Sequence, residues 1–328
     1  MITMKLKPFL KNVSPFNDRS DMPILLFVLK IVLAFFLCKY AGELLAEGVV
    51  ILIHFAVGKN PLRGEMFSPT TITLITYYGY LIVIGITLLY WKLFQKKPLS
   101  SMGITKRFGD YFVGAAVGVL MVAASVFAIL LAGAIKFHGV FKRIDLVTLL
   151  LMLGGFVVQG ATEELLCRGL VLFPLKEKTS LPVAIGISTL LFIIPHLPTL
   201  WAGKPQFVLV GILNLALISV VFCLLTLRLE SVWAACGLHS IWNFVLYNIL
   251  GLNLSGKDTR IAAVFDVRSV GANLLNGGEY GIEASLLTAA VLAVVLVLMI
   301  LFPWKRKKDR SRPLDTDQET GGISRSLF

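Results

Sequence analysis

Charged side chains are scarce in this sequence, and their scarcity excludes most soluble folds. Of the 328 residues, 15% are charged and 57% are hydrophobic, whereas a soluble globular domain is about 25% charged and about 45–50% apolar. Apolar runs of roughly 20 residues, the length that crosses a bilayer, recur along the whole chain. The sequence therefore predicts a polytopic membrane protein.

Cysteine is also rare, and its placement excludes two further classes of protein. The four cysteines are Cys38, Cys167, Cys223 and Cys236. All four lie in apolar runs and none forms a C-x-x-C pair, so we expect neither a disulfide framework nor a cysteine-based zinc site. An H-E-x-x-H metal motif is missing as well. No short apolar stretch with a small-residue cleavage site precedes the first run, which is therefore expected to be an anchor.

Positive charge is in excess, with a formal net charge of +12. Its distribution argues against a nucleic-acid partner, because the positive residues lie in loops and tails beside apolar runs, as the positive-inside rule expects. The basic stretch 305–312 follows directly on a span, and we expect it to contact anionic lipid headgroups. The same rule predicts that both termini are cytoplasmic.

Eight spans are predicted, and they indicate an all-α bundle. Only helices or closed barrels satisfy the backbone in lipid, and these runs are too long and continuous for barrel strands. The predicted domains are a cytoplasmic N-terminal segment (1–22), an eight-helix transmembrane domain (23–303) and a basic, polar, disordered tail (304–328). The predicted spans are residues 23–57, 70–94, 108–135, 146–175, 181–201, 206–227, 231–251 and 284–302.

Three ionisable residues stand together in the fourth span, where charge is costly. Glu163 and Glu164 are about 100° apart on a helix, so they cannot face the same neighbour. Glu164 and Arg168 are four residues apart and are expected to neutralise each other. This arrangement leaves Glu163 without a partner in its own helix, free to act as a general base. The alternative is that all three residues only bridge helices.

A histidine lies near the end of the fifth span. His196 comes between Pro195 and Pro198, and a proline bend could aim its ring at an internal cavity. Phe192, one turn earlier, is interpreted as a packing residue, and His196 alone would be a polar cap. In straight helices the depths of Glu163 and His196 differ by roughly 12 Å, so tilt or the bend must close that gap.

His239 and Asn243 share one face of the seventh span, because they are four residues apart. Two hydrogen-bond donors on one turn can stabilise the negative oxygen of a tetrahedral intermediate. Hydrogen bonding between helices is the alternative use of such residues in membranes.

Taken in order, these segments resemble the motifs of a known family. Residues 163–169, 191–198 and 237–244 are similar to the E-E-x-x-x-R, F-x-x-x-H and H-x-x-x-N motifs of the CAAX protease and bacteriocin-processing (CPBP) intramembrane proteases. Residues 100–104 and the Gly-rich segment 277–285 also resemble parts of that family, although the second has no assigned role. The resemblance covers roughly residues 100–303, the expected protease core.

The resemblance implies an eight-helix bundle with a water-filled active-site cavity within the membrane. It implies that Glu163 activates water, that His196 helps to polarise that water, and that His239 and Asn243 form an oxyanion hole. No cofactor is required by this favoured mechanism. Zinc held by Glu163, His196 and His239 remains an alternative, with one position open for water. The supporting residues are Glu164, Arg168 and Phe192.

The predicted function is therefore an intramembrane endopeptidase acting on a membrane-embedded or lipidated peptide, in a multi-pass protein of the bacterial cell membrane. A non-proteolytic scaffold or bacteriocin-immunity protein, binding a peptide in the same cavity, is the alternative from another class. A transporter is a third, since intramembrane Glu and His also form proton relays. The concentration of these residues in the fourth, fifth and seventh spans favours a single site over a transport path.

Overall fold

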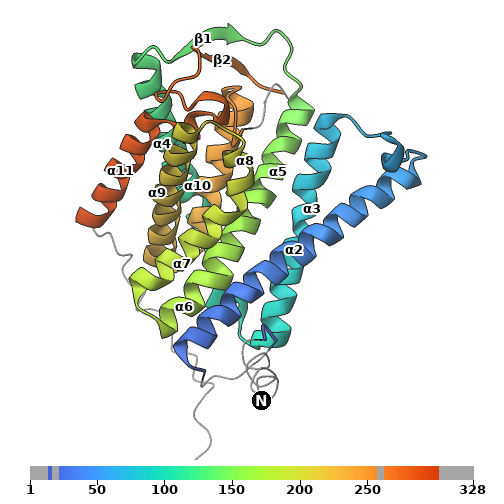
Figure 1. Ribbon diagram of the computed structural model, residues 1–328, viewed down its shortest axis with the longest axis vertical. Coiled ribbons are helices and arrows are strands. Elements are labelled where there is room, and N and C mark those ends of the chain that lie inside the picture. Colours follow the sequence, from blue (N-terminus) through green and yellow to red (C-terminus); the bar gives the residue numbers. More distant parts are fainter. Residues whose placement is uncertain (1–13, 17–21, 257–261, 303–328) are drawn as a thin grey trace, which may run out of the picture.

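The computed structural model describes residues 14–16, 22–256 and 262–302. They form an elongated bundle of helices with a small sheet at one end (Figure 1). The all-α polytopic class is confirmed, because six helices in this described part are long and apolar enough to cross a membrane. Most of the predicted N-terminal segment, 1–22, and the predicted tail, 304–328, lie outside the described residues.

The elements follow one another with short connections. The α-helices are α2 (Ile24–Ala56), α3 (Pro69–Tyr90), α4 (Gly109–Leu131), α5 (Leu146–Glu164), α6 (Phe173–Lys178), α7 (Leu181–Ile193), α8 (Leu197–Trp201), α9 (Pro205–Leu229), α10 (Trp233–Phe244) and α11 (Leu286–Leu301). The π-helical segments are Trp91–Gln95, which extends α3, Leu165–Leu172, which joins α5 to α6, and Val245–Ile249, which extends α10. The 3-10 turns are Pro61–Arg63, Leu99–Met102, Ile194–His196, Gly278–Tyr280 and Ile282–Ala284.

Polar residues mark where several apolar runs become helices. Ser68, Asp145 and Ser285 are N-caps whose side-chain oxygens accept hydrogen bonds from backbone N–H groups of the first helical turn. Such caps satisfy donors that have no partner inside the helix. On the outer faces, large apolar side chains such as Leu120 and Leu209 are exposed, as contact with lipid requires.

The last two of the eight predicted spans are shorter than predicted. The predicted spans 231–251 and 284–302 correspond to α10 with its π-helical extension and to α11, which has 16 residues. At 1.5 Å per residue α11 is about 24 Å long, less than the roughly 30 Å of a hydrocarbon core. Gly251 ends the first of these segments with a φ of +68°, a conformation that glycine adopts without strain.

The predicted third span, 108–135, also ends early, and its last part forms a strand instead. Gly133 has a φ of +68° and follows the end of α4. The chain then enters β1 (Ile135–Val140), which pairs antiparallel with β2 (Phe265–Ser269). The predicted outer loop 252–283 therefore contributes a strand that covers one end of the bundle (Figure 1).

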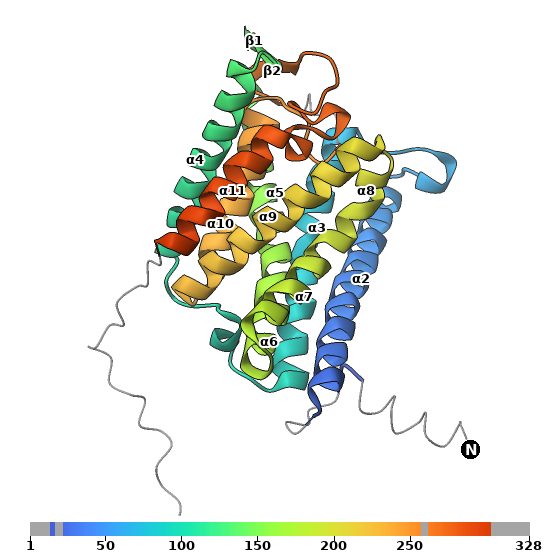
Figure 2. The same cartoon turned by 60° about the vertical axis from the view of Figure 1, so that its left-hand side comes forward.

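The helix α10 lies inside the bundle, because glycines let α4 approach it closely. A Cβ atom at Gly114 would lie 1.7 Å from the carbonyl oxygen of Ala234, and one at Gly237 would lie 2.0 Å from that of Tyr111. Small residues allow the same close approach in many membrane bundles. In contrast, α2 packs against α3 and the segment after α5, along an outer edge of the bundle (Figure 2).

Candidate active site

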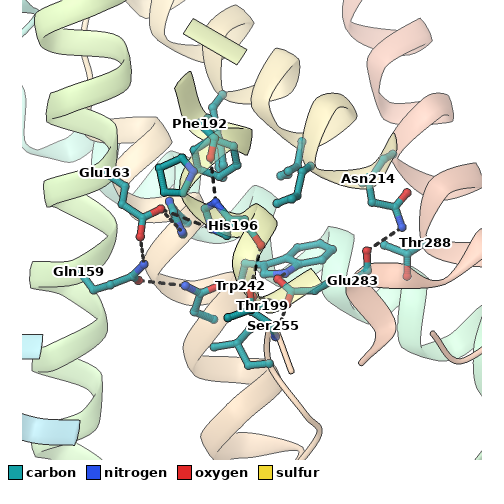
Figure 3. A pocket seen from close by; sticks show the side chains of 18 of the residues that line it. Gln159, Glu163, Phe192, His196, Thr199, Asn214, Trp242, Ser255, Glu283 and Thr288 are labelled. Atoms are coloured by element: carbon teal, nitrogen blue, oxygen red, sulfur yellow. Dashed lines mark hydrogen bonds and ion pairs between the residues drawn. The ribbon is translucent and has the colours of Figure 1, made fainter. Parts of the chain in front are cut away.

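The residues singled out from the sequence meet at one cavity, of about 290 Å³, between the helices (Figure 3). Side chains from α2, α3, α5, α9, α10 and α11 line it, together with the turn that ends α7. Five of the predicted residues lie on its wall: Glu163, Phe192, His196, His239 and Asn243.

Glu163 faces both histidines across this cavity. Its Oε2 atom lies 3.9 Å from Nε2 of His196 and 3.9 Å from Nε2 of His239. The same oxygen has no hydrogen-bond partner among the described residues. The side chains of Glu163 and His196 are 27% and 20% exposed, so the group is open on one side. Three polar atoms from three helical segments thus converge on one partly open point.

The turn after α7 brings His196 to this depth. The helix ends at Ile193 and tightens into the 3-10 turn Ile194–His196, which contains Pro195. The Nδ1 atom of His196 donates a hydrogen bond of 2.8 Å to the carbonyl oxygen of Phe192. In the neutral ring the proton is then on Nδ1, which leaves Nε2 as an acceptor facing Glu163. Glu163 and His196 therefore meet, and the difference in depth expected for straight helices is absent.

Behind His239 lies a dry ionic network. Glu164 and Arg168 pair at 3.1 Å with both side chains fully buried, as their spacing predicts. Oε1 of Glu164 also accepts a hydrogen bond of 2.9 Å from Nδ1 of His239. Nη2 of Arg168 donates to the carbonyl and hydroxyl oxygens of Ser219 at 3.0 and 2.7 Å. The network fixes the orientation of the His239 ring and turns its Nε2 atom towards the cavity.

Aromatic rings complete this wall. Phe222 stacks on the ring of His239, with 5.1 Å between centroids and an interplanar angle of 17°. The guanidinium of Arg168 lies 4.9 Å from the Phe192 ring centroid and 5.0 Å from that of Phe222. Cation–π contacts of this kind are stronger where water is excluded. Phe192 therefore packs, as predicted, and it also contacts the ring of His196.

The prediction that Glu163 has no partner in its own helix is wrong. Nε2 of Gln159, one turn earlier, donates a hydrogen bond of 2.5 Å to Oε1 of Glu163. Oε1 of Gln159 accepts a bond of 3.0 Å from Nδ2 of Asn243. Gln159 thus connects the candidate base to the candidate oxyanion donor. Its i, i+4 spacing to Glu163, the spacing that identified Arg168 as a partner of Glu164, could have revealed it.

Two charged residues on the cavity wall had no role in the sequence interpretation. Lys39 of α2 lines the cavity and pairs with Glu43 one turn later. Glu283, from the Gly-rich segment, lies on the cavity wall, where its carboxylate accepts hydrogen bonds from Ser255 and Trp242 (Figure 3). Burial raises the pKa of Glu283, and the bonds from Ser255, the charge of His196 and the bond from Trp242 oppose that rise. Hydropathy alone could not find Glu283, because it lies outside the spans.

The spacing of these side chains is wider than that of the ligand atoms in a tetrahedral zinc site. Zinc bonds of about 2.0–2.2 Å would put two ligand atoms roughly 3.3–3.6 Å apart in a tetrahedral site. Oε2 of Glu163 is 3.9 Å from each imidazole Nε2. No group of three His, Cys, Asp or Glu side chains within the described ranges is arranged to hold a metal ion.

Comparison with known proteins connects this geometry to a family. Residues 145–245 match the family model "Type II CAAX prenyl endopeptidase Rce1-like". This segment of the chain is similar to the Rce1-like endopeptidases. No curated protein and no solved structure matches the chain. At the level of the family, the match supports a CAAX-type intramembrane protease, hence a peptidase, in a multi-pass membrane protein.

The Rce1-like segment begins at the N-cap of α5 and ends just after α10. It contains all three motifs, and therefore Glu163, His196, His239 and Asn243 of the cavity wall. Lys39 on α2 and Glu283 before α11 lie outside the matched segment. The cavity is thus completed by parts of the chain that the family match does not cover.

Proposed function

We propose that this Rce1-like protein hydrolyses a peptide bond in a membrane-embedded or lipidated peptide, with water activated by Glu163. The observation that carries the proposal is the position of Oε2 of Glu163, 3.9 Å from both imidazole Nε2 atoms. This separation is too long for a direct hydrogen bond. It suits a water molecule that contacts the carboxylate and a ring together.

The chemical step follows from these contacts. The water donates one hydrogen bond to Nε2 of His196 and passes its other proton to Glu163 as its oxygen bonds to the carbonyl carbon. Glu163 then delivers that proton to the amine nitrogen as the C–N bond breaks. Gln159 holds the second oxygen of the Glu163 carboxylate during both transfers. A general base of this kind contributes about 10²–10⁴ in rate.

The negative oxygen of the intermediate is stabilised by two side chains of α10, Asn243 and His239. One N–H of the Asn243 amide bonds to Gln159, which leaves the second N–H for the substrate oxygen. Nε2 of His239 can donate when the ring carries protons on both nitrogens. Glu164 and Glu163 both face this ring and stabilise that charged form. A donor placed in this way contributes a factor of about 10²–10³ to kcat.

The surroundings of the cavity favour a substrate that is itself in the membrane. Five segments of membrane-spanning length line the cavity: α2, α3, α5, α9 and the segment Leu181–Trp201. A peptide attached to lipid, or an apolar peptide, can approach such a site without leaving the bilayer. We further propose that both termini are cytoplasmic, because Lys and Arg are concentrated in the loops and tails of that side.

The test is cleavage of a prenylated reporter peptide and a panel of apolar peptides by the purified full chain in nanodiscs. We expect the Glu163→Gln protein to lose at least about 100-fold in rate while folding normally. Glu177→Gln is the matched control, since Glu177 is exposed and pairs with Lys97. Wild-type activity in Glu163→Gln would overturn the assigned base. If the wild type bound the peptides tightly but did not cleave them, the alternative of a non-proteolytic scaffold would be favoured.

The same cleavage assay in the presence of a zinc chelator tests whether the mechanism is metal-free. We expect wild-type activity to persist after treatment with a strong zinc chelator, because the proposed step uses only side chains and water. Loss of activity on chelation, with recovery on adding zinc back, would contradict that choice.

A further inference from the structure

Glu283 is a second carboxylate on the wall of the proposed catalytic cavity. In the view of Figure 3 it lies on the other side of His196 and Trp242 from Glu163. Its Oε2 atom accepts bonds from the backbone N–H and the hydroxyl of Ser255, at 2.7 and 2.9 Å. Its Oε1 atom accepts a bond of 3.3 Å from Nε1 of Trp242. The carboxylate is thus held in one orientation by neutral donors.

The Gly-rich segment before α11 positions the backbone that carries this side chain. Nδ2 of Asn214 donates to the carbonyl oxygens of Glu283 and Ser285, both at 2.9 Å. Gly277 and Gly281 have φ angles of +77° and +99°, and a Cβ atom at Gly277 would lie 1.9 Å from the carbonyl oxygen of Gly281. Only glycine fits so tight a loop. The segment that had no assigned role therefore forms part of the cavity.

The surroundings of Glu283 differ from those of the acids that are paired inside the bundle. Glu164 has Arg168, and Glu43 has Lys39. Within the described residues Glu283 forms no ion pair. Carboxylates removed from water are normally paired with a cation, because burial without one is costly. A cavity-lining carboxylate that forms no ion pair within the described residues is therefore suited to a cation that a ligand brings.

Two further oxygens on the same wall can each accept a hydrogen bond. Oδ1 of Asn214 and Oγ1 of Thr288 have no hydrogen-bond partner among the described residues. Both side chains line the cavity, and they are 3% and 0% exposed. Together with the carboxylate of Glu283, they make this end of the cavity rich in acceptors. An ammonium or guanidinium group carries several donors and the positive charge that such a wall lacks.

We propose that Glu283, with Asn214 and Thr288, forms a subsite for a lysine or arginine side chain of the peptide substrate. That this peptide is a substrate rests on the proposed function, whereas the subsite itself requires only that the peptide binds. Lys39, the cation on another part of the cavity wall, disfavours a positive group there. The subsite therefore sets the register of the peptide relative to Glu163.

The test measures binding by the Glu163→Gln protein, so that it does not depend on cleavage. The probes are apolar peptides in which a single lysine, or norleucine as its uncharged counterpart, is moved along the chain. We expect one register at which the lysine peptide binds about tenfold tighter or more, as for a hydrogen bond to a charged group. Adding Glu283→Gln should reduce this lysine-to-norleucine ratio to near one. Adding Glu177→Gln should leave it unchanged.

Thr288→Val provides a second variant of nearly the same shape, in case Glu283→Gln folds poorly. It should reduce the lysine-to-norleucine ratio about threefold, since one neutral hydrogen bond is lost. A ratio near one at every register, or a ratio that neither variant changes, would refute the subsite. If the wild type cleaves no peptide but the ratio depends on Glu283, proteolysis is refuted and the subsite stands. If cleavage occurs without any charge preference, only the subsite is refuted.

Discussion

Charged side chains have different surroundings in the wall behind His239 and in the cavity in front of it. Behind the ring, Glu164 and Arg168 are fully buried and paired. In front, the side chain of Glu163 is 27% exposed and its Oε2 atom lies 3.9 Å from two imidazoles, although the two glutamates are adjacent in sequence. Paired charges in a buried wall hold a geometry, whereas a partly exposed carboxylate on a cavity can accept a proton. Glu164 and Arg168 therefore position the His239 ring, whereas Glu163 takes part in the proposed reaction.

Removing the cation of the dry wall should have the largest effect on stability. Arg168→Ala leaves Glu164 as a buried charge without its partner, which costs about 3–5 kcal/mol. We expect a sharp loss of folded protein, measured as the monodisperse fraction after extraction and as the thermal midpoint. The double variant Glu164→Gln with Arg168→Met should recover part of the loss, because it removes both charges. A normal yield of Arg168→Ala would show that the pair does not form.

A change on the cavity side should instead affect the reaction and spare the fold. Asn243→Ala removes an amide that donates towards the cavity, and we expect kcat to fall by about 10²–10³. The thermal midpoint should stay near that of the wild type, since the side chain is at the cavity edge. Asn60→Ala is the control, an identical deletion at the exposed cap of a short turn. A change in KM alone would contradict the role of Asn243 in the transition state.

The smallest effect should come from the residue that joins base and amide. Gln159→Leu removes the bonds to Glu163 and Asn243 but no group that touches the substrate. We expect kcat to fall about tenfold, the equivalent of one hydrogen bond. The effect should be smaller in an Asn243→Ala background, because the two residues act together. Gln206→Leu, at an exposed position of α9, is the control. Additive effects of Gln159→Leu and Asn243→Ala on kcat would contradict the connection between these two residues.

Local patterns explain why much of this molecule was predictable. Apolar runs predict spanning helices because the backbone must satisfy itself in lipid, and six such helices are found within the described residues. The i, i+4 spacing predicts the pair of Glu164 and Arg168 because neighbours on one helix face meet wherever that helix goes. The same rule applied to Gln159 and Glu163 would have given a second contact.

Other features depended on contacts between distant segments. The shortness of α10 and α11 follows from the turns and strands around them, not from their hydropathy. β1 forms because the predicted outer loop returns to pair with it. Glu283 lines the cavity because Asn214, far away in sequence, holds its backbone. None of these contacts has a signature at fixed spacing along the chain.

The sequence by itself determined the membrane class, the helical fold and the polar residues worth attention, since each of these follows from composition or from spacing within one helix. The tertiary structure alone decided that Glu163, His196 and His239 converge on one cavity, that Gln159 joins base to amide, and that Glu283 completes the wall. The physical reason is that hydropathy and helical periodicity act over a few turns. The relative depth, tilt and rotation of helices come instead from packing among side chains that are far apart in the chain.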